Sequence, residues 1–345
     1  MVNVAIHGAT GYGGIELIRL LRSHPHVSLS HLTSETYAGQ RVSDVYPHLA
    51  GVDLPLQKLD PQAAAKCDFA LLAVPAGLAM GVVPALLEAE TRIIDVSPDF
   101  RLRQASLYSH WYKQSHTCPE LLSEAAFGIP EWNRDAVTSA RLVAVPGCYS
   151  TGALLALSPL VQDGLIETDD IIVDGKTGIS GAGRTSLKLP YHFPEADEDV
   201  AAYGVGGHRH LPEMVQELAR LAGSEIRLTF APHLVPMSRG MLLTIYATPK
   251  SGAGPGELRH SLSRRYEEEP FVHVLPEGKW PHTKWAAGTN SCFIAIGTDE
   301  ATGRAILVSA LDNLGKGYAG QMVQCLNLMM GVDESCGIAL RAAYP

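Results

Sequence analysis

The chain has 345 residues, of which 46% are hydrophobic, so it is long enough for about two domains, each with its own core. Its formal net charge is −9 and it has no long basic block, which argues against a nucleic-acid-binding face. No apolar run approaches the roughly 18 residues that would span a membrane, and no charged and apolar leader precedes the first strand. We therefore expect a soluble cytoplasmic protein without nucleic-acid or membrane partners.

Short apolar runs alternate with helical segments through the first half of the chain. Near-continuous apolar strands separated by helices indicate a parallel sheet covered on both faces, the doubly wound layout of Rossmann-type nucleotide-binding domains. The expected strands are 2–6, 27–32, 69–74, 93–96 and 142–145, and the expected helices are 13–22 and 78–88.

The first strand leads directly into a glycine-rich turn, Gly8-Ala9-Thr10-Gly11-Tyr12-Gly13-Gly14. The first glycine permits a tight turn, the middle one lets the backbone approach a pyrophosphate, and the following helix N-terminus favours its charge. We expect a dinucleotide to bind this turn. The candidate ligands are Gly8, Thr10, Gly11, Tyr12 and Gly13.

Ser34 and Glu35 come about 20 residues after the glycines, at the end of the second strand, where the adenosine ribose is expected. A carboxylate suits the free 2′-hydroxyl of NAD, whereas Ser34 and nearby backbone could accept the 2′-phosphate of NADP. The residues themselves leave the choice between NAD and NADP open.

Cys148 lies where a buried strand ends and a helix, expected over 150–160, begins. A thiol at a helix N-terminus meets the partial positive charge of backbone N–H groups, which favours the reactive thiolate. Cys148 is therefore the best nucleophile candidate, although many free cysteines are simply small buried hydrophobes. The six cysteines are widely spaced and form no Cys-x-x-Cys pair, so we expect free thiols and no metal site.

After Cys148 fewer helices separate the strands, which indicates a second α+β domain with a mixed or antiparallel sheet. Glycine and proline concentrate in 175–194 and 203–212, which are expected to be functional loops. The expected strands are 171–174, 226–230, 241–247, 293–297 and 306–310, and the expected helices are 212–221, 256–268 and 314–330.

The segment His208-Arg209-His210 precedes a helix that carries Glu213. In an extended segment His208 and His210 face the same way, and either imidazole could serve Cys148 as base and later as acid, with Glu213 orienting it. Spacing does not choose between the two histidines. Arg184, Arg209 and Arg239 place positive charge in glycine-rich loops of an acidic chain, which favours an anionic substrate.

With these motifs in place, the chain resembles the N-acetyl-gamma-glutamyl-phosphate reductases, the arginine-biosynthesis branch of the semialdehyde dehydrogenase group. The resemblance covers nearly the whole chain. It rests on the glycine turn 8–14, Tyr37-Ala38-Gly39, Val145-Pro146-Gly147-Cys148-Tyr149, Ser180-Gly181-Ala182-Gly183-Arg184, His208-Arg209-His210 with Pro212-Glu213, Ser238-Arg239-Gly240, and Asp312-Asn313-Leu314 with Lys316-Gly317.

The resemblance implies a domain division, site residues and a reaction. Residues 1–147 plus 314–345 would bind the dinucleotide, with the final helix packing back on that domain, and 148–313 would carry catalysis. Cys148 would attack an acyl phosphate to form a thioester, which NADPH reduces to an aldehyde. The family usually forms dimers or tetramers, so a homodimer or homotetramer is expected. Ser180, Gly181 and Asn313 would lie near the nicotinamide.

Two positions depart from the family pattern. Glu35 stands where the family commonly has Arg, which puts the usual NADP preference in doubt and keeps NAD possible. Ser150 stands where Pro is frequent, and we expect it to be tolerated as a helix-capping residue.

Two other functions remain open. The first is the lysine-pathway homologue that reduces a carrier-bound aminoadipyl phosphate, and the second is a non-catalytic dinucleotide-binding regulator.

Overall fold

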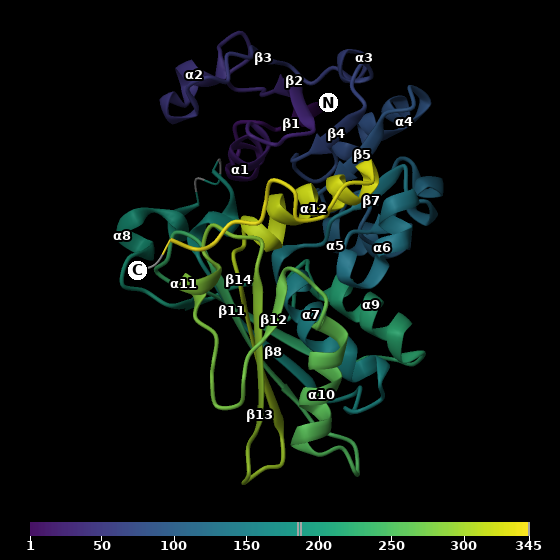
Figure 1. The fold of residues 1–345 in the computed structure, drawn as a ribbon, viewed down its shortest axis with the longest axis vertical. Coiled ribbons are helices and arrows are strands. Elements are labelled where there is room, and N and C mark those ends of the chain that lie inside the picture. Colours follow the sequence, from purple (N-terminus) through teal and green to yellow (C-terminus); the bar gives the residue numbers. More distant parts are fainter. Residues whose placement is uncertain (185, 187, 344–345) are drawn as a thin grey trace. The chain divides into compact units, whose positions relative to one another are not determined.

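The computed structural model describes residues 1–184, 186 and 188–343, and the chain divides into two compact units (Figure 1). The first unit comprises Met1–Pro146 and Tyr318–Ala339, and the second comprises Gly147–Gly317 and the residues from Leu340 on. Gly147 and residues 314–317 and 340–343, which were expected in the first domain, thus group with the second unit. Residues 344–345 of the expected first domain, and 185 and 187 of the expected loop 175–194, lie outside the described residues.

The first unit is built on a sheet whose described strands all pair in parallel. Buried apolar residues fill its central strands, as expected for a sheet covered on both faces. The order across the sheet is β3 (Leu56–Gln57), β2 (Val27–Thr33), β1 (Val2–His7), β4 (Phe69–Leu72), β5 (Arg92–Asp95), β7 (Leu142–Ala144) and β6 (Ala126–Phe127). This confirms the predicted doubly wound domain.

The helices of this unit include one from the far end of the chain. The helix α12 packs against α1, α6 and β5, which confirms that the final helix returns to the first domain. Gln321 fixes it there by donating to the Gly128 carbonyl at 2.9 Å. The helical elements are α1 (Tyr12–Leu21), α2 (Val42–Val45), η1 (Pro47–Leu49), α3 (Pro61–Ala64), α4 (Ala79–Glu88), α5 (Ala105–Tyr112), η2 (Pro119–Ser123), α6 (Pro130–Ser139) and α12 (Gly320–Met330).

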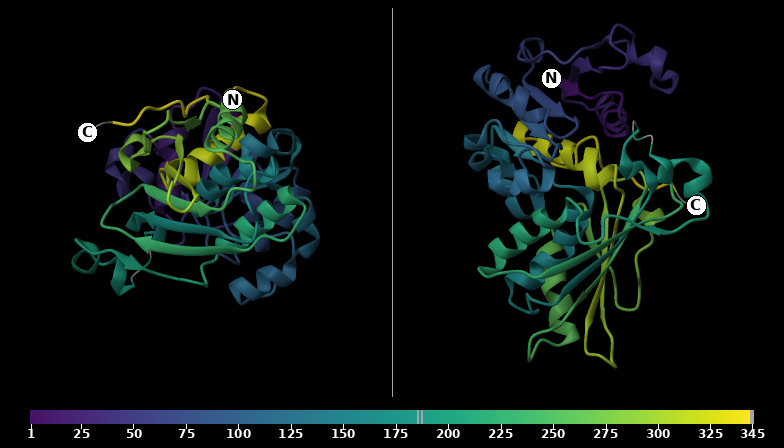
Figure 2. Two further views of the ribbon diagram at one scale, coloured as in Figure 1. Left: turned by 90° about the horizontal axis from the view of Figure 1, so that it is seen from below. Right: turned by 180° about the vertical axis from the view of Figure 1, so that it is seen from behind.

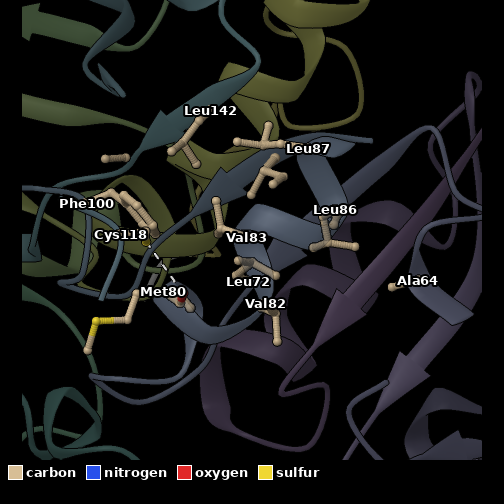
Figure 3. Close-up of a cluster of buried hydrophobic side chains, with 14 of the residues drawn as sticks. Ala64, Leu72, Met80, Val82, Val83, Leu86, Leu87, Phe100, Cys118 and Leu142 are labelled. Atoms are coloured by element: carbon tan, nitrogen blue, oxygen red, sulfur yellow. Dashed lines mark hydrogen bonds between the residues drawn. The ribbon is translucent and has the colours of Figure 1, made fainter. Parts of the chain in front are cut away.

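A core cluster forms where α4 covers the sheet (Figure 3). Met80, Val83 and Leu87 recur at helical spacing and pack with Leu72 of β4 and Leu142 of β7. Each such side chain contributes about 1.5–3 kcal/mol when it is fully buried. The packed core therefore supports the strand-to-helix turns at the edge of this sheet.

The second unit is built on a mixed sheet, as predicted. The pairs β8–β10 and β12–β13 are parallel, and the other described pairs are antiparallel. The order is β12 (Val272–Val274), β13 (Cys292–Thr298), β14 (Ala305–Leu311), β11 (Met241–Ala247), β8 (Ile171–Thr177), β10 (Leu228–Leu234) and β9 (Ala201–Ala202).

One face of this second sheet is covered by α7 (Cys148–Gln162), α9 (Leu211–Ala222) and α10 (Pro255–Tyr266), which gather on the same side in both views (Figure 2). Buried and half-buried residues alternate along β8 and β11, because successive side chains point to opposite faces. The shorter elements are η3 (Ile179–Ala182), η4 (Leu189–Tyr191), α8 (Phe193–Ala196), α11 (Thr283–Ala286) and the π-helix η5 (Gly315–Ala319).

Several boundaries differ from those expected. The helix expected over 150–160 begins at Cys148, the strand expected over 226–230 is Leu228–Leu234, and the helix expected over 314–330 consists of η5 followed by α12. The short strands β3, β6, β9 and β12 and the helices α5 and α6 had no strong apolar periodicity and were not expected. Among the described residues no helix is long and apolar enough to cross a membrane.

Candidate active site

Glycine occupies different positions of the first turn for different structural reasons. Gly8 has a φ of +80°, and a Cβ there would lie 2.2 Å from the Ala73 carbonyl oxygen. A Cβ at Gly14 would lie 2.2 Å from the Gly8 carbonyl oxygen, so this glycine lets α1 approach β1. At Gly11, the N-cap of α1, the nearest atom would be 3.6 Å away. The backbone at Gly11 is thus the part of the turn that a pyrophosphate can approach.

Gly13 is glycine because of a neighbouring aromatic ring. A Cβ at Gly13 would lie 2.1 Å from Tyr318 Cε1, so the half-buried tyrosine ring fills the space beside the first turn of α1. Tyr12 begins the helix and is 41% exposed. Of the two tyrosines beside Gly13, Tyr12 is the more exposed to solvent.

The end of β2 is tied to the glycine turn. The hydroxyls of Thr10 and Ser34 are 2.7 Å apart, and Ser34 Oγ accepts the Tyr37 N–H at 3.2 Å. Glu35 is exposed, and its Oε1 accepts the Leu59 N–H at 3.1 Å. This bond draws the Glu35 carboxylate toward the segment after β3.

Cys148 is the first residue of α7, and Gly147 is the N-cap. None of the six cysteines forms a disulfide, which confirms that prediction, and Cys148 is one of two that are only partly buried. A Cβ at Gly317 would lie 2.7 Å from Cys148 Cβ, so the missing side chain of Gly317 makes room for the cysteine. The thiol therefore stands at a helix N-terminus with partial access to solvent.

His210 lies against the residue that precedes the cysteine. A Cβ at Gly147 would be only 2.2 Å from His210 Nε2, 2.4 Å from Cδ2 and 2.5 Å from Cε1. The imidazole thus packs directly over the Gly147 Cα, with Nε2 as its nearest atom. Ser150 Oγ donates to the His210 carbonyl oxygen at 3.2 Å, which ties the histidine loop to α7. Ser150 is the third residue of α7, so the expectation that it caps the helix was wrong.

His208 has a different environment. Its ring packs edge-on against Tyr149, Tyr203 and Phe230 and lies 4.7 Å from the His210 ring, centroid to centroid. Burial, reinforced by the neighbouring His210, lowers the pKa of His208 to about 3. Its Nδ1 accepts the His210 N–H at 3.1 Å. His208 is therefore neutral near pH 7 and supports the backbone of His210.

Glu213 is fully buried in the first turn of α9, and its Oε2 accepts the Gly147 N–H at 2.8 Å. A buried carboxylate stabilises the backbone donor that it accepts from. Glu213 therefore fixes the turn that carries the nucleophile.

The predicted anion-binding loops are joined by two residues that follow β14. Asn313 Oδ1 accepts the Gly240 N–H at 2.7 Å, and Asn313 Nδ2 donates to Ser180 Oγ at 3.0 Å. Arg239 Nε lies 2.7 Å from Asp312 Oδ2. The structure thus brings together Ser180, Arg239 and Asn313. Gly181 lies beside them, since its Cβ would be 3.9 Å from Asn313 Nδ2, whereas Arg184 lies in the turn after η3 and Arg209 is exposed between the histidines.

A polar cluster at the carboxyl end of β5 was missed by the sequence reasoning. Ser97 donates to both oxygens of Asp95, at 2.8 Å from its N–H and 2.7 Å from its hydroxyl. Asp99 accepts the Gly77 N–H at 2.8 Å and the Tyr108 hydroxyl at 2.7 Å. Burial, together with Asp99, raises the pKa of Asp95 to about 8. The available signal was a run of polar residues directly after a buried strand.

Known proteins resemble this chain in architecture and in sequence. Residues 3–140 match the family model described as "Semialdehyde dehydrogenase, NAD binding domain", and residues 148–313 match "Semialdehyde dehydrogenase, dimerisation domain". The N-acetyl-gamma-glutamyl-phosphate reductase of Synechocystis sp. is 48% identical, over 99% of this chain and 98% of the relative. That of Desulforudis audaxviator is 47% identical over the full length of both.

The chain belongs to the N-acetyl-gamma-glutamyl-phosphate reductase family. This family lies within the semialdehyde dehydrogenases, which are oxidoreductases, so the first unit is a nicotinamide-dinucleotide-binding domain.

Solved structures of more distant proteins agree on the fold. Aspartate semialdehyde dehydrogenase II of Vibrio cholerae, complexed with ASA, has a TM-score of 0.73 at 19% identity, covering 96% of this chain and 98% of that chain. The Candida albicans enzyme with NADP has a TM-score of 0.70 at 17% identity, covering 96% and 98%. These likenesses confirm the predicted two-domain fold.

Proposed function

We propose that this chain reduces N-acetyl-gamma-glutamyl phosphate to N-acetylglutamate semialdehyde and phosphate through a Cys148 thioester, with NADPH as reductant. Relatives named for this activity match the chain over its full length at 45–48% identity. The observation that carries the mechanism is the His210 imidazole packed over Gly147, next to a cysteine at the N-terminus of α7.

The first requirement is a thiolate. The N-terminus of α7 favours negative charge on Cys148, and His210 is the base that takes the thiol proton. His208 does not fill that role, because its Nδ1 is engaged by the His210 N–H and burial disfavours its charged form. Glu213 and Ser150 are positioning residues, since each bonds to the backbone around the cysteine or the histidine.

The acylation step forms a bond from Cys148 Sγ to the substrate carbonyl carbon and breaks the bond from that carbon to the phosphate oxygen. Phosphate leaves with the electron pair, and a thioester remains on Cys148. A reduced nicotinamide, when bound, would supply hydride to the thioester carbonyl carbon. Protonated His210 gives its proton to the resulting oxyanion, which forms the hemithioacetal. His210 takes that proton back as the C–S bond breaks, so the aldehyde forms and Cys148 leaves as the thiolate.

The substrate carries oxyanions, and the chain offers guanidinium groups for them. Arg239 is oriented by Asp312, and Arg184 and Arg209 lie in the two other glycine-rich loops. Guanidinium groups bind phosphate and carboxylate in a fixed geometry. We assign the substrate-binding role to these three arginines.

The cofactor residues fit a dinucleotide because Gly11 leaves its backbone approachable and caps the N-terminus of α1. Gly8, Thr10, Gly11, Tyr12 and Gly13 would hold or shape the pyrophosphate turn, and Ser180, Gly181 and Asn313 would hold the nicotinamide.

We further propose a preference for NADP. The Glu35 carboxylate is already engaged with the Leu59 amide, which draws it toward the segment after β3. Ser34 and the backbone at this strand end would take the 2′-phosphate.

The assignment of roles to the two units follows. The first unit would bind the dinucleotide and the second would carry catalysis. We also propose a cytoplasmic homodimer or homotetramer. The absence of disulfides among the six cysteines supports the compartment, and the family description of 148–313 as a dimerisation domain supports the oligomer. Light scattering after gel filtration tests this directly, and a single monomeric species at micromolar concentration would refute the oligomer.

Two other functions are disfavoured. A reductase for carrier-bound aminoadipyl phosphate would share the chemistry, but the full-length relatives are named for the acetylated glutamyl substrate. A non-catalytic regulator would have no need for an imidazole packed beside the cysteine turn.

The decisive assay runs the reaction in reverse, with N-acetylglutamate semialdehyde, phosphate and either NADP⁺ or NAD⁺. Phosphate-dependent formation of NADPH supports the proposal. Reduction of NAD⁺ alone would overturn the cofactor preference, and no reaction with either cofactor would overturn the substrate.

A further inference from the structure

The carboxylate of Asp312 is buried and is surrounded by N–H groups. Its Oδ1 accepts the Leu314 N–H at 2.9 Å and the Gly315 N–H at 3.3 Å. Its Oδ2 accepts the Gly288 N–H at 2.5 Å and lies 2.7 Å from Arg239 Nε. The residue has an exposed fraction of 0%, and a buried charge persists when it is paired and hydrogen-bonded in this way.

Arg239 connects this buried carboxylate to the solvent-accessible side of its loop. The arginine side chain is 29% exposed, while its Asp312 partner is 0% exposed. Because the guanidinium is planar and rigid, an ion pair at its Nε restricts the directions that the whole group can take. Asp312 therefore helps to set where Arg239 points.

The same short segment reaches the other groups of the site. Asn313 bonds to Gly240 and to Ser180, and the Gly317 N–H donates to the Asp312 carbonyl oxygen at 2.9 Å. Gly317 in turn packs on Cys148. The backbone from Asp312 to Gly317 thus contacts both Arg239 and Cys148 and helps to position both side chains.

We propose that Asp312 is a positioning residue that acts through Arg239 and sets the affinity for an oxyanion of the substrate. The oxyanion is either the phosphate or the substrate carboxylate, which present the same chemistry to a guanidinium. Asp312 itself is buried and does not touch the substrate. The inference rests on the proposed function, since it assumes that Arg239 meets a substrate anion.

The test uses the reverse reaction and the variants Asp312→Asn and Arg239→Lys. Asparagine keeps the size of Asp312 but removes its charge, and lysine keeps the charge of Arg239 but loses the planar Nε edge. Each variant should raise the KM of one substrate about tenfold, with kcat within about threefold of the wild type. A rise for phosphate identifies the phosphate as the oxyanion, and a rise for the semialdehyde identifies the carboxylate.

A double-mutant cycle separates positioning from folding. In an Arg239→Ala background, Asp312→Asn should produce no further change in either KM, because its effect passes through the arginine. Asp163→Asn is the matched control: Asp163 also pairs with an arginine, with Arg264 Nη2 at 2.8 Å, but it lies at the C-terminal end of α7. That variant should keep both KM values.

Unchanged KM values in both Asp312→Asn and Arg239→Lys would overturn the proposal. An equal change of KM on Asp312→Asn in the wild-type and Arg239→Ala backgrounds would also overturn it. If Asp312→Asn does not fold, an unchanged KM in Arg239→Lys overturns the proposal by itself. If the wild type does not turn over the semialdehyde, the proposed function fails separately. The anion site is then tested by alkylation of Cys148 with iodoacetamide in the presence of phosphate or acetate. Protection of Cys148 should need about tenfold more of the anion in the variants than in the wild type. If neither anion protects the wild type, the proposal is overturned.

Discussion

Replacing Gly147 by alanine should remove most of the activity while leaving the fold intact. The Gly147 backbone has a φ of −66° and a ψ of 154°, which alanine adopts without strain. Its new methyl group, however, would lie 2.2 Å from His210 Nε2, whereas ordinary contacts begin at 3.4 Å. The imidazole must therefore move by about 1 Å or more, and a displacement of that size costs about 100-fold in rate.

The histidine cannot accommodate the methyl group by shifting its backbone. The His210 N–H is bonded to His208 and its carbonyl oxygen to Ser150, so the ring has to rotate away from the cysteine turn. We expect kcat to fall about 100-fold, with the KM of the dinucleotide unchanged. The matched control is Gly207→Ala in the same loop, where a Cβ would meet nothing within 4 Å. Steady-state kinetics with equal melting temperatures would decide, and a Gly147→Ala enzyme with more than half of the wild-type kcat would refute the role given to His210.

Three further predictions follow from the histidines and from Glu35. His210→Asn should lower kcat by about 100- to 10,000-fold, as expected for loss of a general base, whereas His208→Asn keeps an acceptor for the His210 N–H and should lose less than about tenfold; equal, mild losses would contradict the assignment. Because the pKa of His208 is lowered to about 3, the unfolded chain binds a proton between about pH 3 and 6.5 that the native chain does not, so stability is full above that window and falls as pH decreases through it. His208→Asn should therefore reduce the pH dependence of urea unfolding between pH 6 and 4 by about one proton, and an unchanged slope would argue against a buried neutral ring. Glu35→Gln should raise kcat/KM for NADPH about fivefold relative to NADH by removing a like charge near the 2′-phosphate; no change in the ratio would place the phosphate elsewhere.

The sequence predicts the parts of this protein that depend on local signals. The parallel sheet, the glycine turn and the helix beginning near Cys148 follow from apolar runs and from the placement of glycine, and the structure contains each of them. The return of α12 to the first unit agrees with the family resemblance, because it depends on packing over a separation of some 200 residues, as between Gln321 and Gly128.

Other features depend on tertiary contacts that spacing does not reveal. His208 and His210 are equivalent in sequence, and only the aromatic rings around His208 and the contact of His210 with Gly147 distinguish them. The capping role expected for Ser150 was wrong because α7 begins two residues earlier, at Cys148. The pairing of Arg239 with Asp312 joins loops that are distant in the sequence, so neither loop alone predicts it.

The proposed mechanism requires that Cys148 carry the acyl group. Enzyme incubated with N-acetyl-gamma-glutamyl phosphate in the absence of nicotinamide should release one equivalent of phosphate and retain an acyl group, and peptide mass spectrometry should locate that group on Cys148. Hydroxylamine should remove it, and Cys148→Ala should abolish both the release and the label. An acyl group on another residue, or turnover by Cys148→Ala, would refute the thioester mechanism.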